Sequence, residues 1–231
     1  MAPDELCERL DHLQSALREA ERRYGRPAGS VRLVAVSKTQ PVARLRVALA
    51  CGQRAFGENY AQEFHDKVTA IGAEAAEWHF IGPLQSNKTR LVANTAHWVQ
   101  SIDRFKIARR LAEQRDPARP PLQVCLQVNL DAEPGKAGVA PAELPALAEQ
   151  VAGLDRLRLR GLMCIPRPRR DFDAQRRSFA RLRALLEDLQ GRGHALDTLS
   201  MGMSADFRAA IAEGATLVRI GTALFGPRRT A

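Results

Sequence analysis

The sequence of 231 residues has no long hydrophobic run and few aromatic residues. No stretch approaches the roughly 20 consecutive apolar residues that a membrane-spanning helix needs. The chain starts with the polar segment Met1-Ala2-Pro3-Asp4-Glu5, which lacks the basic and then apolar pattern of a secretion signal. We therefore expect a cytoplasmic protein without a membrane partner that, at this length, folds as a single domain over residues 1–231.

Closely spaced cysteines are absent as well. The four cysteines, Cys7, Cys51, Cys125 and Cys164, lie far apart and form none of the Cys-x-x-Cys pairs of zinc sites and dithiol redox sites. In a cytoplasmic protein such cysteines are expected to be reduced and mostly buried. The sequence thus predicts no metal site and four free thiols.

A concentrated basic patch is also missing. The formal net charge is +9, but the basic residues are spread along the chain, and only Arg167, Arg169 and Arg170 form a dense cluster. Aromatic residues make up 5% of the chain, which is few for a platform that stacks nucleic-acid bases. We interpret the charge as a general bias toward arginine and expect no nucleic-acid partner, with a basic RNA-binding module kept as an alternative.

Lysine is rare in this arginine-rich chain. Of the 35 basic residues 30 are arginine, and the five lysines are at positions 38, 67, 88, 106 and 136. A guanidinium group stays protonated, whereas a desolvated lysine amine loses its proton and attacks carbonyl carbons. A lysine at a special place in the fold is therefore a candidate for amine chemistry.

Short, apolar, β-branched segments alternate with helical patterns along most of the chain. The first 24 residues place four leucines, Leu6, Leu10, Leu13 and Leu17, on one face of an amphipathic helix. Strand-like segments follow near residues 31–38, 54–58, 78–82, 97–102, 122–130, 157–165, 198–201 and 216–220. Helical segments separate them, and the clearest is 172–189.

Eight such units predict a (β/α)8 barrel, because strands that alternate with helices form parallel sheets with right-handed crossovers. The alternative is a doubly wound open sheet, but no Gly-x-Gly-x-x-Gly motif follows the first strand. The sequence shows no substantial eighth helix after the last strand. We expect the N-terminal helix to cover the barrel flank that this leaves exposed.

In such a barrel, function gathers where the strands end, and Lys38 lies at the end of the first one. Val34, Val36 and Lys38 point to the same side of an extended strand, so the amine projects among apolar neighbours. Partial desolvation favours the neutral amine that condenses with an aldehyde. Taken alone, a lysine that closes a strand more often marks a solvated strand end, so Lys38 by itself does not establish amine chemistry.

Small and hydroxyl-bearing residues follow the last two strands. Ser200-Met201-Gly202-Met203-Ser204 comes after the seventh strand, and Arg219-Ile220-Gly221-Thr222 ends the eighth. Loops at these two places commonly bind phosphate in barrels through backbone N–H groups, and hydroxyl groups add further donors. Each segment alone also reads as an ordinary turn, but together they predict a phosphate site opposite Lys38.

Two other polar residues have structural interpretations. His79 lies within an apolar strand and is expected to be a hydrogen-bonded core histidine. Lys88, in a Ser-Asn-Lys-Thr turn, is expected at the start of a helix, with a phosphate contact as the alternative.

Several motifs, in order along nearly the whole chain, closely resemble the pyridoxal phosphate homeostasis protein family, which is related to the N-terminal barrel of alanine racemase. The motifs are Ala35-Val36-Ser37-Lys38-Thr39, Phe56-Gly57-Glu58-Asn59-Tyr60, Trp78-His79-Phe80-Ile81-Gly82-Pro83-Leu84-Gln85-Ser86-Asn87-Lys88, Gly161-Leu162-Met163, Leu199-Ser200-Met201-Gly202-Met203-Ser204 and Val218-Arg219-Ile220-Gly221-Thr222-Ala223-Leu224-Phe225-Gly226.

The resemblance implies a site for pyridoxal 5′-phosphate (PLP). Lys38 is then the lysine that forms an internal aldimine with PLP, and Arg219 faces the pyridine nitrogen. The phosphate is held by Ser200, Ser204, Gly221 and Thr222, and the remaining ring or phosphate contacts are Asn59 and Met201. A permanently charged arginine at the ring nitrogen disfavours ring protonation and weakens the cofactor as an electron sink.

The sequence departs from the racemase pattern in one respect that bears on catalysis. Racemase relatives carry a second, β-rich domain with a tyrosine base, and this chain stops five residues after Gly226, with only Tyr24 and Tyr60 remaining. We therefore expect a monomeric carrier that buffers PLP or delivers it to PLP-dependent apo-enzymes and so influences vitamin B6 and amino-acid or keto-acid balance, without substantial catalysis and with no catalytic residue. The alternative is a minimal PLP-dependent amino-acid racemase or lyase.

Overall fold

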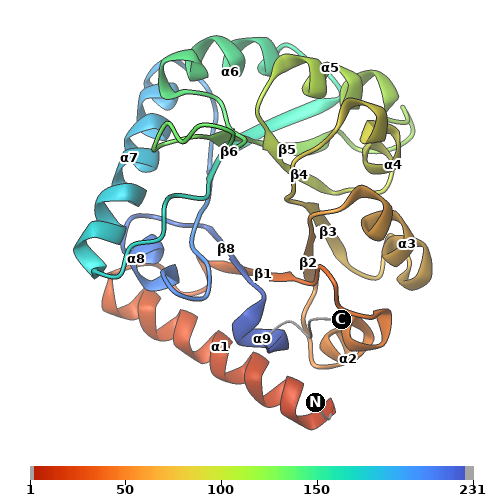
Figure 1. The fold of residues 1–231 in the computed structure, drawn as a ribbon, viewed down its shortest axis with the longest axis vertical. Coiled ribbons are helices and arrows are strands. Elements are labelled where there is room, and N and C mark those ends of the chain that lie inside the picture. Colours follow the sequence, from red (N-terminus) through yellow and green to blue (C-terminus); the bar gives the residue numbers. More distant parts are fainter. Residues whose placement is uncertain (1–2, 227–231) are drawn as a thin grey trace.

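The computed structural model describes residues 3–226, which form a closed barrel of eight parallel strands in sequence order (Figure 1). The strands are β1 (Arg32–Val36), β2 (Ala55–Glu58), β3 (Glu77–Phe80), β4 (Trp98–Ile102), β5 (Leu122–Val128), β6 (Leu157–Cys164), β7 (Thr198–Ser200) and β8 (Leu217–Ile220). Strand β1 pairs with β8, with Arg32 opposite Leu217 and Ala35 opposite Ile220, which closes the sheet. The (β/α)8 prediction and all eight predicted strands are confirmed, and the open-sheet alternative is excluded.

Helices surround the barrel (Figure 1). They are α1 (Pro3–Arg23), α2 (Val42–Ala50), α3 (Ala61–Ile71), α4 (Thr89–Ala93), α5 (Phe105–Gln114), α6 (Leu144–Ala152), α7 (Phe172–Gly191), α8 (Phe207–Ala212) and α9 (Thr222–Phe225), with single 3₁₀ turns η1 (Ser86–Lys88) and η2 (Pro141–Glu143). Within residues 3–226, every helix is too short or too polar to span a lipid bilayer. Lys88 ends η1 directly before α4, as expected for a residue at a helix start.

Apolar periodicity explains why these segments fold as they do. Helix α7 buries one stripe that includes Phe179, Leu182 and Leu189, and its N-terminus is capped by the Asp171 side chain, which accepts a hydrogen bond from the Ala174 amide at 2.8 Å. Each such buried side chain contributes roughly 1.5–3 kcal/mol to folding. Successive side chains of β1 point to opposite faces of the sheet, because Leu33 belongs to the main core, whereas Val34 belongs to a separate small cluster.

Helix α1 covers one flank of the barrel, as predicted. Its leucines at 6, 10, 13 and 17 are at most 6% exposed. In Figure 1 the helix runs along the side of the barrel past α2, α9 and α8, and it contacts all three. Helix α9 has only four residues, so α1 supplies the cover that a full eighth helix provides in a regular barrel.

The expectation of four reduced thiols is wrong for one pair. Cys7 in α1 and Cys51 at the end of α2 form a disulfide with a Cα–Cα distance of 5.4 Å. The two are 44 residues apart in sequence and meet only because α1 packs on α2. Cys125 and Cys164 are buried free thiols, and burial raises the pKa of each to about 12.

Candidate functional site

Five of the predicted site residues line one pocket of about 260 Å³ at the carboxyl ends of β1, β7 and β8. These residues are Lys38, Ser204, Arg219, Gly221 and Thr222, and Val36, Gln40, Met203, Ala205 and Gly226 complete the described lining. The three strands are neighbours because β8 pairs with both β1 and β7. Closure of the barrel therefore brings the first loop of the chain beside the last two.

A buried charged cluster fixes the turn that carries Lys38. The Lys67 ammonium of α3 donates to the Ser37 carbonyl at 2.7 Å, and the Thr39 amide donates to Glu63 Oε1 at 2.6 Å. The backbone is therefore bound on both sides of Lys38. Thr39 has a φ of 64°, in the left-handed region that residues with a Cβ seldom adopt, so these contacts stabilise an unfavourable conformation.

Lys67 also connects the two carboxylates of this cluster. Its ammonium lies 2.7 Å from Glu58 Oε1 and 2.7 Å from Glu63 Oε1. Glu58 is fully buried and accepts a further hydrogen bond from the Ser37 hydroxyl at 2.6 Å. Burial raises the pKa of Glu58, and the neighbouring Lys67 charge opposes that rise.

Arg219 is a buried cation whose direct partners are neutral. It is 4% exposed, and its guanidinium donates from Nη1 to Ser200 Oγ at 2.6 Å and from Nη2 to the Cys164 carbonyl at 2.7 Å. Within residues 3–226, no carboxylate lies within ion-pair distance of it, and burial lowers its pKa. The Asp206 carboxylate acts on Arg219 only from beyond ion-pair distance, and a buried charge without a directly bonded counter-ion is costly. A ligand in the pocket that offers an anion or a lone pair would offset this cost.

Small residues let the loops after β7 and β8 approach each other and β1. A Cβ on Gly202, which has a φ of 96°, would lie 2.7 Å from the Ala210 Cβ. A Cβ on Gly221 would lie 3.0 Å from the Val36 carbonyl oxygen. Ser204 Oγ accepts a hydrogen bond from the Ala223 amide at 3.4 Å. The two loops that the sequence predicts to bind phosphate, after β7 and β8, are thus packed tightly around the pocket wall.

Three predicted site residues lie outside the described lining of this pocket. Ser200 is fully buried and reaches the pocket only through Arg219. Met201 is fully buried in the main hydrophobic core. Asn59 lines a separate pocket of about 450 Å³ together with Tyr60 and Lys88.

His79 is a fully buried, hydrogen-bonded core histidine, as predicted. Its Nε2 lies 2.6 Å from Glu77 Oε1, and its Nδ1 lies 2.8 Å from the Gln100 side-chain nitrogen. Its ring stacks on Trp98 at a centroid distance of 5.6 Å. Burial lowers the pKa of His79.

Sequence reasoning missed the supporting residues Lys67 and Gln100. A signal existed for each: Lys67 is one of only five lysines, and Gln100 is a polar residue inside an otherwise apolar strand segment. Neither signal identifies a partner, because both residues bond to groups from other strands and loops.

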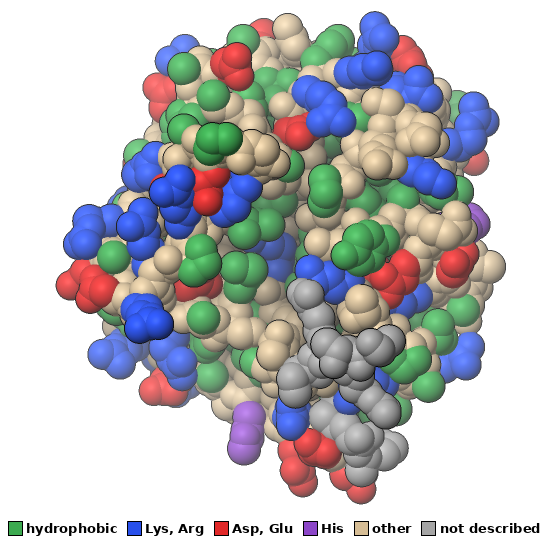
Figure 2. All heavy atoms as spheres, in the orientation of Figure 1, with side chains coloured by type: hydrophobic (Ala, Val, Ile, Leu, Met, Phe, Trp, Pro, Cys, Tyr) green, Lys and Arg blue, Asp and Glu red, His purple; other side chains and the backbone are tan. Residues whose placement is uncertain are grey.

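Figure 2 shows Lys and Arg side chains spread over the viewed face among Asp and Glu.

The chain matches the family model of the alanine racemase N-terminal domain over residues 9–229. It is 56% identical over 223 residues to the pyridoxal phosphate homeostasis protein of Pseudomonas aeruginosa, covering 96% of each chain. It is 46% identical over 228 residues to the protein of the same name from Escherichia coli K12, covering 97% of each.

A solved structure of PipY from Synechococcus elongatus with PLP bound is similar in both fold and sequence. The TM-score is 0.84 at 39% identity, and the match covers 96% of this chain and 100% of that one.

Proposed function

Because this chain belongs to the pyridoxal phosphate homeostasis protein family, we propose that it binds PLP in the pocket between β1, β7 and β8 and buffers or delivers it. This role contributes to vitamin B6 and amino-acid or keto-acid balance. The observation that carries the proposal is the pairing in one pocket of the Lys38 amine with a buried Arg219 whose partners are neutral.

The donor set of the pocket fits PLP. An aldehyde needs an amine, a phosphate needs hydroxyl and backbone donors in a tight loop, and a pyridine nitrogen offers a lone pair to a guanidinium. We assign the aldehyde to Lys38, the phosphate to Ser204, Gly221 and Thr222, and the ring nitrogen to Arg219. Ser200 is already bonded to Arg219 and to Gln100, so we assign it the role of a partner of Arg219 instead of a phosphate contact. Asn59 and Met201 stay predictions.

Reversible condensation makes the site suited to storage. When bound, PLP supplies an aldehyde that condenses with a neutral amine, forming a C=N bond with loss of one water, and hydrolysis or a second amine reverses this. A charged Arg219 facing the ring nitrogen would weaken PLP as an electron sink, which supports a carrier without substantial catalysis. PLP-dependent apo-enzymes as recipients, a cytoplasmic location and a monomeric state are parts of the same proposal.

Borohydride reduction followed by peptide mass spectrometry tests the anchor. Reduction should fix PLP on Lys38 in the wild-type protein, and Lys38→Ala should lose the adduct and the yellow colour. Lys106→Ala, which removes an exposed lysine of α5, should keep both. An undiminished adduct in Lys38→Ala would exclude Lys38 as the anchor.

A racemase or lyase is the second candidate, because the matched family model is that of a racemase domain. Chirality-resolved assays over many amino acids separate the two functions. Turnover near ordinary enzyme rates, on the order of 1 to 10³ per second, would show that the protein is an enzyme and would overturn the carrier function.

A further inference from the structure

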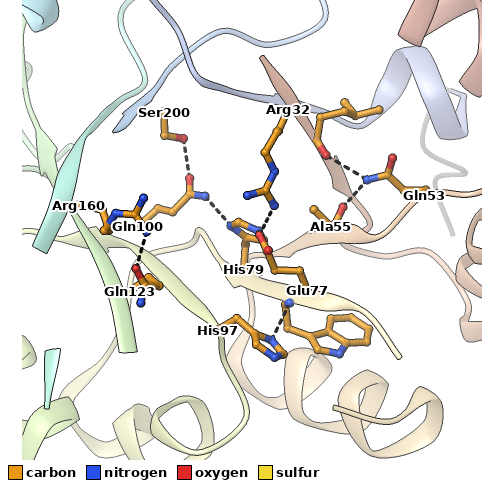
Figure 3. Close-up of polar contacts among 12 residues, drawn as sticks. Arg32, Gln53, Ala55, Glu77, His79, His97, Gln100, Gln123, Arg160 and Ser200 are labelled. Carbon is orange, nitrogen blue, oxygen red and sulfur yellow. Dashed lines mark hydrogen bonds and ion pairs between the residues drawn. The ribbon is translucent and has the colours of Figure 1, made fainter. Parts of the chain in front are cut away.

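A chain of hydrogen bonds crosses the interior of the barrel from the pocket to its opposite end. Arg219 contacts Ser200, and the Ser200 hydroxyl donates to Gln100 Oε1 at 2.6 Å. The Gln100 amide nitrogen lies 2.8 Å from His79 Nδ1, and His79 Nε2 lies 2.6 Å from Glu77. Figure 3 shows the links from Ser200 to Glu77, which in turn pairs with Arg32.

Every donor in this chain points the same way. An amide nitrogen only donates, so His79 accepts at Nδ1 and carries its proton on Nε2, which donates to the Glu77 carboxylate. Gln100 Oε1 must then accept from Ser200, which leaves the lone pairs of Ser200 for Arg219. The orientation of the Gln100 amide thus determines which side of the Ser200 hydroxyl faces the guanidinium.

This chain of hydrogen bonds is unusual for the interior of a barrel. The interior of such barrels is normally filled by layers of branched apolar side chains. Here His79, Gln100 and Ser200 are fully buried, and burying polar groups costs free energy unless all are bonded. Packing alone does not require this set, since an apolar side chain would fill the same space. Of its two ends, Arg219 lines the pocket between β1, β7 and β8, whereas Arg32, paired with Glu77, lines a separate pocket beside α1.

We propose that Gln100 is a positioning residue for the pocket, which acts through Ser200 to hold the Arg219 guanidinium in its ligand-binding orientation. This inference rests on the proposed function, because the ligand used to detect it is PLP. With Gln100 in place, Ser200 offers Arg219 an acceptor and both groups are held in one geometry. Without it, the Ser200 hydroxyl has no acceptor for its proton, so neither the hydroxyl nor the guanidinium bonded to it is held in one orientation.

A matched pair of variants tests the proposal. Gln100→Met removes the amide from the chain, whereas Gln53→Met removes a buried amide of equal size, which bonds only to the Leu33 and Ala55 carbonyls (Figure 3). Both should lower the free energy of unfolding. Only Gln100→Met should weaken PLP binding, at least tenfold in Kd by equilibrium dialysis and with a shifted absorption band, while Gln53→Met stays within twofold of wild type.

A double-mutant cycle shows whether Gln100 acts through Ser200. Ser200→Ala should weaken PLP binding as Gln100→Met does, and the double variant should be no weaker than Ser200→Ala alone. Ser200→Ala also serves as the test if Gln100→Met does not fold. Wild-type affinity in Gln100→Met or in Ser200→Ala, or additive losses in the double variant, would overturn the inference. Absence of PLP binding by the wild-type protein would instead overturn the proposed function.

Discussion

Lys67 is a buried lysine whose ammonium contacts three oxygen atoms, those of Ser37, Glu58 and Glu63. Lysine is rarely buried unless it is paired. Here it neutralises a fully buried carboxylate and also binds the backbone next to Lys38. One side chain therefore connects the stability of the barrel to the geometry of the proposed PLP anchor.

Replacing Lys67 by Met should lower the free energy of unfolding by about 3 kcal/mol, because it leaves the Glu58 carboxylate buried without a counter-charge. Urea unfolding measures this loss. Glu58→Gln in the same chain removes the unpaired charge and should recover part of the loss. Lys106→Met is the control and should change the free energy of unfolding by less than about 0.5 kcal/mol. Equal effects of Lys67→Met and Lys106→Met would show that the cluster contributes nothing.

The buried His79 should make stability depend on pH. In the unfolded chain a histidine takes up a proton below about pH 6.5, whereas burial lowers the pKa of folded His79. The unfolded state then binds more protons, so the free energy of unfolding falls as pH drops below about 6.5, by at most about 1.4 kcal/mol per pH unit.

Urea unfolding of wild type and His79→Gln between pH 7.5 and about 5.5 measures this contribution. His97, whose pKa burial also lowers, is present in both proteins and cancels in the difference. The gap between the two stabilities should narrow as the pH falls. A constant gap would mean that His79 is protonated equally in the folded and unfolded states.

At the scale of elements, α1 is joined to the barrel by its leucine face and by one covalent link. The Cys7–Cys51 disulfide closes a segment with a sequence separation of 44 residues. Cross-links of this kind stabilise mainly by restricting the unfolded chain. Helix α1 packs along α9 and α8 as well as α2, so holding its N-terminal end supports the side of the barrel that contains β8.

Replacing both Cys7 and Cys51 by Ser should lower the free energy of unfolding by about 2–4 kcal/mol. Unfolding of the oxidised wild-type protein with and without dithiothreitol gives the same comparison without mutation. The double variant should not respond to dithiothreitol. Insensitivity of the wild-type protein would show that the disulfide is absent or contributes nothing to stability.

The elements could be predicted from the sequence, and their contacts only in part. All eight strands follow from short apolar, β-branched runs, and α1 follows from four leucines at helical spacing. The disulfide depends on how α1 lies against α2, which no local pattern encodes. Ser200 and Met201 illustrate the same limit: adjacent side chains at the end of β7 point to opposite sides, so Ser200 bonds to Gln100 inside the barrel and Met201 packs in the core.

At the scale of the whole molecule, barrel closure creates the proposed site. Lys38 and Thr222 are far apart in sequence but share one pocket, because β1 pairs with β8. Their grouping could be predicted, since the carboxyl ends of neighbouring parallel strands meet at one end of a barrel. The proposed role of Gln100 could not be predicted from the sequence, because it depends on partners in β3 and β7.

Because a ligand that binds only the folded state stabilises it by mass action, PLP at 100 times its Kd should add about 2.7 kcal/mol. For a domain of this size that corresponds to a rise in Tm of roughly 5–10 °C. Pyridoxal lacks the phosphate that the loops after β7 and β8 are proposed to hold, so at the same concentration it should raise Tm much less. Lys38→Ala should keep part of the PLP-induced rise, because the phosphate contacts remain. Equal rises with PLP and pyridoxal would mean that these loops do not bind phosphate, whereas a rise with inorganic phosphate alone would support them directly.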